Sequence, residues 1–403
     1  MKFLFFLIWL FIITIIPQFI VFGIVFNTLF LLTIPVLITN YKLFFRDISL
    51  NVFLILFLFI LFFHFIVSIY NQYFEFGIFK QILIFPVIFI NYYYYIKKFQ
   101  NYKPLDTLKY LFLFTLGVLL LNSITIILTV LSSSFSDILY KFVYLTEKQA
   151  GGISESRLIP RYSGFAVSGF SFLSFKYMFL YIISILFLLK SRLSSIQSIY
   201  IIFSSLVIII SLFFVARTGL LFVILFFFWF IANKYLKKIR IKEVFFVIFF
   251  TIAIYKFIVV FLEDKFGLAL IRSFDYVFNY LENSEIDNGT IADLSKELIF
   301  PDSLLDWLFG TGDFGRDREL ITDIGWLTFI NGSGLLGVFI YYIPYYFLFF
   351  KAWFTDYRII ASALILCSFI TNAKDLVYLE HGYIQGFCIL SILILWRKYH
   401  RLA

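Results

Sequence analysis

Apolar runs of roughly 20 residues recur along the whole chain, and short polar segments separate them. An α-helix needs about 20 such residues to cross the hydrocarbon core of a bilayer. Lipid offers no hydrogen-bond partners to the backbone, so these runs can span it only as helices. We therefore predict an all-α, polytopic helical membrane protein with about 12 transmembrane helices. The expected spans are residues 3–16, 19–39, 50–69, 79–95, 110–131, 165–189, 196–214, 220–231, 244–262, 324–350, 359–371 and 382–396.

Basic residues mark one side of these spans. If the N-terminus is cytoplasmic, most lysines and arginines fall in the short cytoplasmic segments, including Lys97, Lys98, Lys237, Lys238 and Arg240. An excess of Lys and Arg is typical of cytoplasmic loops. We expect both termini to be cytoplasmic and residues 1–403 to form a single integral membrane domain.

Two long segments fall on the opposite side of the membrane. They are residues 132–164 and residues 263–323, and the second carries most of the acidic residues. Loops of this length on a rigid scaffold commonly carry function. We predict two external loops and an activity at the outer membrane–water boundary.

Composition supports the membrane class and narrows the chemistry. Hydrophobic residues make up 62% of the chain and charged residues 14%, whereas soluble domains carry about 25% charged residues. The net charge of +9 follows from the basic cytoplasmic loops, so it indicates topology and not nucleic-acid binding. The three histidines are too scattered for a metal motif. We expect no metal and no cofactor.

Arg217 stands at the mouth of the predicted span 220–231, where a guanidinium is costly without an anion nearby. That anion is either a protein carboxylate or a ligand phosphate. Arg161 lies at a comparable depth before span 165–189, and neither arginine has an acid adjacent in sequence. Arginine binds phosphate oxygens with a forked pair of hydrogen bonds. Arg157, Arg316 and Arg318 are further candidates for an anionic ligand, although neighbouring acids favour ion pairs for the last two.

Candidate acids and bases lie in the late external segments. Glu380 and His381 form either an acid/base pair at the membrane surface or a solvated turn that caps a helix. Asp313 and Asp323 lie in the second external loop. These four residues are the candidates for a general base.

Three other features favour structural roles. Residues 310–315 match the glycine spacing of a dinucleotide fingerprint, but no strand precedes them, so we predict a turn that shapes the external loop. Lys176 lies deep in its span and is expected to face the bundle interior. His64 is expected to be hydrogen-bonded within the bundle.

Several short pieces of sequence occur in a characteristic order. They are Arg161-Tyr162-Ser163-Gly164-Phe165, Ala216-Arg217-Thr218-Gly219-Leu220-Leu221, Leu308-Phe309-Gly310-Thr311-Gly312, Asp323-Ile324-Gly325-Trp326-Leu327 and Gly332-Ser333-Gly334-Leu335-Leu336-Gly337. Their order and spacing resemble the superfamily of O-antigen polymerases (Wzy) and O-antigen ligases, which are bacterial envelope glycosyltransferases.

The resemblance implies a metal-independent, inverting glycosyltransferase at the external face of the bacterial cytoplasmic (inner) membrane. It would transfer a growing glycan from undecaprenyl diphosphate onto a lipid-linked repeat unit in surface polysaccharide or lipopolysaccharide synthesis. The arginines would hold the diphosphate and stabilise it as a leaving group, and an external carboxylate or His381 would deprotonate the acceptor hydroxyl. Its partners would be undecaprenyl-diphosphate-linked oligosaccharide, membrane lipids and a chain-length regulator protein.

Two alternatives stay open at this stage. A ligase that attaches the finished chain to lipid A-core would share the fold and the arginines. A polysaccharide flippase or transporter would show broken or charged helices near the bilayer midplane and an internal repeat, and no convincing repeat is present in the sequence.

Overall fold

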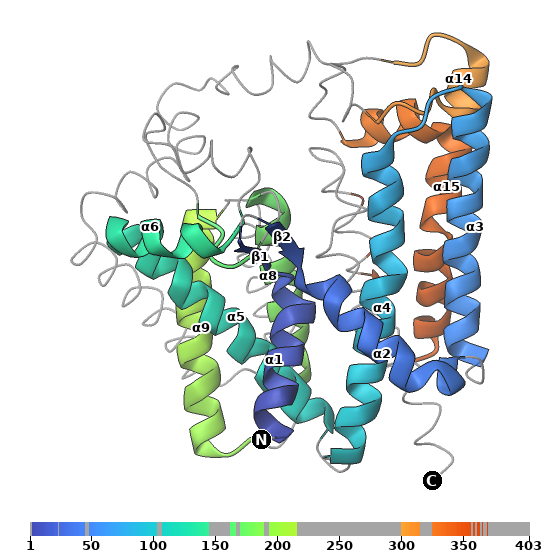
Figure 1. Cartoon of the computed structure of the whole chain (residues 1–403). Coiled ribbons are helices and arrows are strands. Elements are labelled where there is room, and N and C mark those ends of the chain that lie inside the picture. Colours follow the sequence, from blue (N-terminus) through green and yellow to red (C-terminus); the bar gives the residue numbers. More distant parts are fainter. Residues whose placement is uncertain are drawn as a thin grey trace, which may run out of the picture. The chain divides into compact units, whose positions relative to one another are not determined.

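The computed structural model describes residues 2–22, 24–44, 48–102, 107–144, 162–166, 170–188, 193–215, 300–314, 325–355, 358, 361, 362, 365 and 369. These residues are mostly helical, as predicted (Figure 1). The chain divides into two compact units. Unit 1 consists of Met1–Thr28 and Leu105–Asp287, and unit 2 consists of Leu29–Pro104 and Asn288–Ala403.

Unit 1 is built around one long apolar helix. Its elements are α1 (Lys2–Ile15), β1 (Gln18–Val21), β2 (Ile24–Asn27), α5 (Thr107–Leu131), α6 (Ser133–Phe142), α8 (Phe170–Leu188) and α9 (Ser195–Val215). Helix α5 packs against α1, α8 and α9. A Cβ on Gly117 would come within 2.8 Å of the Tyr200 hydroxyl, and that hydroxyl donates to the Leu113 carbonyl at 3.1 Å. Small residues of this kind let membrane helices approach closely.

A short β-hairpin corrects the start of the predicted second span. Strands β1 and β2 pair antiparallel, with Val21 opposite Ile24 across a two-residue turn, and helix α2 (Thr28–Phe44) begins only at Thr28. The prediction of a helix over residues 19–27 is therefore wrong. A short apolar run fits a strand as well as a buried helix, and Pro17 prevents α1 from continuing into it.

Unit 2 has an aromatic core. Its elements are α2, α3 (Ile48–Tyr70), α4 (Phe76–Tyr102), α14 (Leu304–Phe309) and α15 (Gly325–Trp353). Ring centroids of Phe57 and Phe85 lie 4.2 Å apart, and those of Phe85 and Tyr345 lie 6.4 Å apart. These contacts hold α3, α4 and α15 together. Helix α4 also holds α2, because the Asn91 side chain donates to Thr33 Oγ1 at 2.6 Å.

Among the described residues, three helical stretches are long and apolar enough to cross a membrane: Lys109–Leu131, Ser195–Val215 and Gly325–Trp353. The chain is accordingly a helical membrane protein. The total of about 12 crossings, the two external loops and the single membrane domain stay predictions. The predicted spans 220–231, 244–262 and 382–396, and most of 359–371, lie outside the described residues.

Contacts between loops join segments that the charge pattern assigns to the same side. In unit 1, the Tyr144 backbone N–H donates to the Gln18 carbonyl at 2.9 Å. In unit 2, the Phe314 backbone N–H donates to Glu75 Oε2 at 2.6 Å. All four residues fall in segments predicted to be external, and the side of the membrane on which they lie stays a prediction.

Candidate functional site

A tight turn in unit 2 is seated on a broken helix. Helix α14 ends at Gly310, whose backbone N–H donates to the Asp306 carbonyl at 2.8 Å. The following backbone then bonds to α15: Thr311 N–H donates to the Asn331 carbonyl at 2.6 Å, and Gly312 N–H donates to the Gly332 carbonyl at 3.0 Å. Over the described part of residues 310–315, the chain bends at Gly312 and has positive φ at Gly310 and Gly312; that this segment shapes an external loop stays a prediction.

Glycine is required on both sides of this contact. Gly310 has φ 76° and Gly334 has φ 66°, which is a backbone region that favours glycine. A Cβ on Gly310 would lie 2.5 Å from the Gly334 backbone nitrogen, and a Cβ on Gly334 would collide with the Leu308 carbonyl. Gly334 has non-helical dihedral angles inside α15, so this helix is broken where the turn docks.

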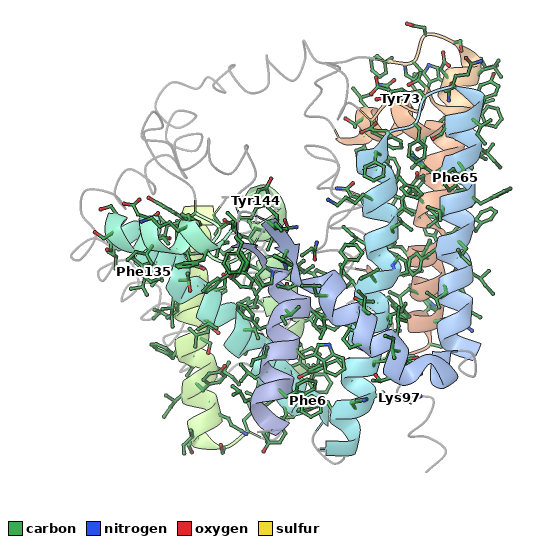
Figure 2. All side chains as sticks on the ribbon, in the orientation of Figure 1. Phe6, Phe65, Tyr73, Lys97, Phe135 and Tyr144 are labelled. Carbon is green, nitrogen blue, oxygen red and sulfur yellow. The ribbon has the colours of Figure 1, made fainter. Side chains whose placement is uncertain are left out.

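The segment between α3 and α4 closes the turn from the other side. Asn71 Nδ2 donates to the Gly310 carbonyl at 3.1 Å. Glu75 has no exposed surface, and its Oε2 accepts the 2.6 Å hydrogen bond from Phe314 N–H. Figure 2 labels Tyr73, which lies in the same segment between α3 and α4, near α14.

Asp313 lies inside this assembly. Its side chain is 3% exposed, and its backbone N–H donates to Thr311 Oγ1 at 3.3 Å. The ring centroids of the next residue, Phe314, and of His64 lie 6.1 Å apart. His64 is buried, and its Nδ1 lies 3.3 Å from the Tyr341 hydroxyl. The predicted hydrogen bonding of His64 within the bundle is therefore confirmed.

Unit 1 holds a second segment that depends on a glycine, residues 162–166, which we call the strap. Asn122 on α5 clamps both sides of Gly164: its Nδ2 donates to the Ser163 carbonyl at 3.2 Å, and its Oδ1 accepts from Phe165 N–H at 2.7 Å. Gly164 has φ 61°, and a Cβ there would lie 2.6 Å from Asn122 Oδ1. The strap is thus fixed against the middle of the bundle.

The strap also reaches α9 and α6. Tyr162 N–H donates to the Phe214 carbonyl at 3.1 Å, one residue before α9 ends. Tyr140, on α6, lies beside Ser163 and Gly164, and burial raises the pKa of its phenol to about 12. The phenol is neutral at physiological pH, because its pKa lies well above 7.

A buried lysine joins α8 to α1 in the same unit. Lys176 is 2% exposed, and its Nζ donates to the Ile15 carbonyl at 3.2 Å. Ile15 is the last residue of α1, where helical carbonyls lack intrahelical partners. The predicted inward orientation of Lys176 is confirmed.

Of the predicted site residues, the structure describes Asp313. The candidates that lie outside the described residues are Arg157, Arg161, Arg217, Arg316, Arg318, Asp323, Glu380 and His381. Within the described ranges, no group of three or more His, Cys, Asp or Glu side chains could hold a metal ion.

Sequence reasoning missed two residues that organise these segments. Glu75 is the single acid between predicted spans 50–69 and 79–95. Asn122 is a polar residue in the middle of the apolar run 110–131. Polar residues inside membrane segments are rare and commonly functional, and this signal marks Asn122.

Comparison with known proteins gives no family to which the chain can be assigned. No family model matches the sequence, and neither a curated protein nor a solved structure matches it.

Proposed function

We propose that this protein is a surface-polysaccharide polymerase of the O-antigen type. It transfers a glycan chain from undecaprenyl diphosphate onto a lipid-linked repeat unit at the external face of the bacterial cytoplasmic membrane. The reaction inverts the anomeric carbon: the acceptor hydroxyl attacks it, the bond to the diphosphate breaks, and the hydroxyl proton passes to a protein base. Both termini are cytoplasmic in this proposal.

One observation carries the proposal. Two sequence pieces on which the family resemblance rests, residues 308–312 and residues 332–337, pack directly against each other in unit 2. Glycine is needed at their contact for steric reasons on both sides. Two sequence pieces that pack together support the family resemblance more strongly than two unconnected matches do. Asp313 directly follows the first piece.

The strap supports a shared role for the two arginines. Arg161 directly precedes Tyr162, and Arg217 follows Phe214 by three residues. Tyr162 and Phe214 are hydrogen-bonded, so both arginines adjoin the same junction in sequence. We propose that both guanidinium groups bind the donor diphosphate and stabilise it as it leaves. Arg157, Arg316 and Arg318 are secondary candidates for the same role.

Asp313 is the proposed acceptor base among the described residues, with Asp323, Glu380 and His381 as the other candidates. A base must be held within hydrogen-bond reach of the proton that it removes. Glu75 fixes the backbone on the C-terminal side of Asp313 through Phe314 N–H. We assign Glu75 the role of a positioning residue.

The decisive experiment is reconstitution. The purified chain in proteoliposomes is supplied with a single lipid-linked repeat unit, and products are separated by length. A polymerase yields a ladder of longer lipid-linked glycans without further protein. A parallel sample also contains lipid A-core. Formation of glycan on lipid A-core alone would identify a ligase, and transbilayer movement without a new glycosidic bond would identify a transporter.

The transporter alternative has one observation in its favour. Helix α15 is broken at Gly334, and discontinuous helices are typical of transporter binding sites. In this chain, however, the carbonyl groups of Asn331 and Gly332, next to the break, accept backbone hydrogen bonds from Thr311 and Gly312. The break is therefore explained by the docked turn, and the polymerase remains the better-supported function.

A further inference from the structure

Helix α6 has three distinct faces. At about 3.6 residues per turn, Ser136, Leu139 and Tyr140 form one face, and all are buried or half-buried. The outward surface divides into two stripes of i, i+4 pairs. Ile138 and Phe142 form an apolar stripe and are 57% and 61% exposed, whereas Asp137 and Lys141 form an exposed polar stripe.

The position of α6 in the chain places it at a membrane boundary. The candidate span Lys109–Leu131 ends one residue before α6 begins. That intervening residue, Ser132, caps α6, because its side chain accepts a hydrogen bond from Phe135 N–H at 3.2 Å. In Figure 1, α6 runs crosswise to α5 and α9. This orientation fits a helix that lies along the membrane plane.

The β-hairpin adjoins α6 and carries an apolar tip. Phe19 forms a β-bridge with Val143, and Tyr144 N–H donates to the Gln18 carbonyl. Figure 2 labels Tyr144 near this hairpin. The tip residue Phe22 is 99% exposed and has φ 52°. Hairpin turns that need positive φ normally use Asn, Asp or Gly. A phenylalanine there suits contact with lipid better than contact with water.

We propose that α6 and the β1–β2 hairpin form an interfacial membrane anchor, which rests on the lipid headgroup region at the end of the α5 span. Ile138, Phe142 and Phe22 enter the boundary between headgroups and acyl chains, and Asp137 and Lys141 face water. The three-faced pattern is the one required of a helix that contacts protein, lipid and water at once. The anchor fixes the depth of the strap in the membrane, because Tyr140 of α6 lies beside Ser163 and Gly164. The proposal does not depend on the polymerase activity.

The test uses spin labels on neighbouring positions of one helix. Single-cysteine variants D137C, I138C, K141C and F142C are made in a C367S, C388S background, which removes both native cysteines. F22C probes the hairpin tip, and S136C on the inward face reports whether the helix geometry is kept. The labelled full-length protein is reconstituted in vesicles of phosphatidylcholine and phosphatidylglycerol. Collision rates with lipid-soluble oxygen and a water-soluble nickel chelate are measured.

The expected ratio of oxygen to chelate collisions is several-fold higher at positions 138, 142 and 22 than at positions 137 and 141. The label at position 136 should be shielded from both reagents. Equal ratios at the four outward positions of α6, or free access of the chelate to positions 138 and 142, would overturn the proposal. Shielding of positions 138 and 142 from both reagents would also overturn it, because protein would then cover the stripe. Apart from the label at buried Ser136, the labels replace exposed side chains, so the fold should tolerate them.

Discussion

The Tyr162 backbone N–H donates to the Phe214 carbonyl at 3.1 Å. This bond joins the strap, which precedes α8 in the chain, to the end of α9. Asn122 holds the same strap from α5 on both sides of Gly164. The two arginines that the sequence singles out are attached to this junction, one residue before Tyr162 and three residues after Phe214.

Arg217→Lys should strongly reduce polymer formation, because lysine keeps the charge but cannot form the forked pair of hydrogen bonds with phosphate. Arg217→Ala should be at least as severe, and Arg161→Ala should resemble it. The measurement is the length ladder of lipid-linked glycan in a strain without the native gene, normalised to protein amount. Arg192→Ala, in a predicted cytoplasmic loop, serves as the control and should leave the ladder unchanged. A normal ladder from Arg217→Ala at wild-type abundance would eliminate the phosphate role.

Asn122→Ala should destabilise unit 1 by about 2 to 4 kcal/mol, because it leaves buried backbone groups of the strap without partners. It should also shorten the glycan ladder, since the strap precedes the proposed diphosphate site. The matched control is Asn91→Ala, which removes a buried asparagine that bonds to Thr33 in unit 2. That control should lower the melting temperature in detergent yet keep the ladder per amount of protein. If the two variants gave equal glycan ladders per amount of protein, the strap would have no specific role in polymer formation.

Gly334→Ala should destabilise the protein by about 3 kcal/mol, since the new methyl group meets the Leu308 carbonyl in addition to the cost of positive φ. Gly312→Ala is the matched control: it has φ 78°, but its Cβ would lie at ordinary contact distances, the nearest atom being 3.5 Å away. It should cost only about 1 kcal/mol. Melting temperatures in detergent compare the two variants. Similar decreases in melting temperature would mean that the positive φ alone, and not the contact between residues 308–312 and α15, determines the loss of stability.

Asp313→Asn should abolish polymer while protein abundance stays normal, if Asp313 is the acceptor base. Glu75→Gln keeps an acceptor oxygen for Phe314 N–H but loses the charge, so it should reduce both activity and melting temperature. Asp302→Asn, at an exposed position of the same segment, is the control and should have neither effect.

The remaining candidate bases belong to the same test. Single alanine changes at Asp313, Asp323, Glu380 and His381 should include one that abolishes polymer at normal abundance. Full chain-length distributions from all four variants would rule out general-base catalysis by these groups.

Reporter fusions should place the long loops outside. Fusions after Ser136 and Asn288 should be active with reporters that work outside the cytoplasm, whereas a fusion after Ser191, in a basic loop, should be active with a cytoplasmic reporter. Cytoplasmic activity at Ser136 or Asn288 would reverse the topology.

Sequence patterns predicted most of the described helices, because long apolar runs leave few alternatives in a membrane. They also predicted the inward position of Lys176, since a buried ammonium must find acceptors within the protein. The hairpin at residues 18–27 could not be predicted in the same way. Its residues are as apolar as a span, so this short run fits a helix as well as a pair of strands.

The candidate site was only partly predictable. The glycines of residues 310–312 and 332–334 indicated a turn and a span entrance, but nothing in their spacing showed that the two pieces pack together. Glu75 was missed because its role depends on Phe314, which lies 239 positions later. Contacts of that sequence separation follow from the tertiary fold and have no local signature.

That separation also sets an order of assembly during synthesis. Ribosomes add about 5–20 residues per second, so Glu75 is made some tens of seconds before the backbone amide of Phe314 exists. Throughout that interval the Glu75 side chain, just before α4, lacks the Phe314 amide as a partner. Desolvation of Glu75 can therefore occur only once the α14 segment has been delivered, which makes closure of the turn a late event in the maturation of unit 2.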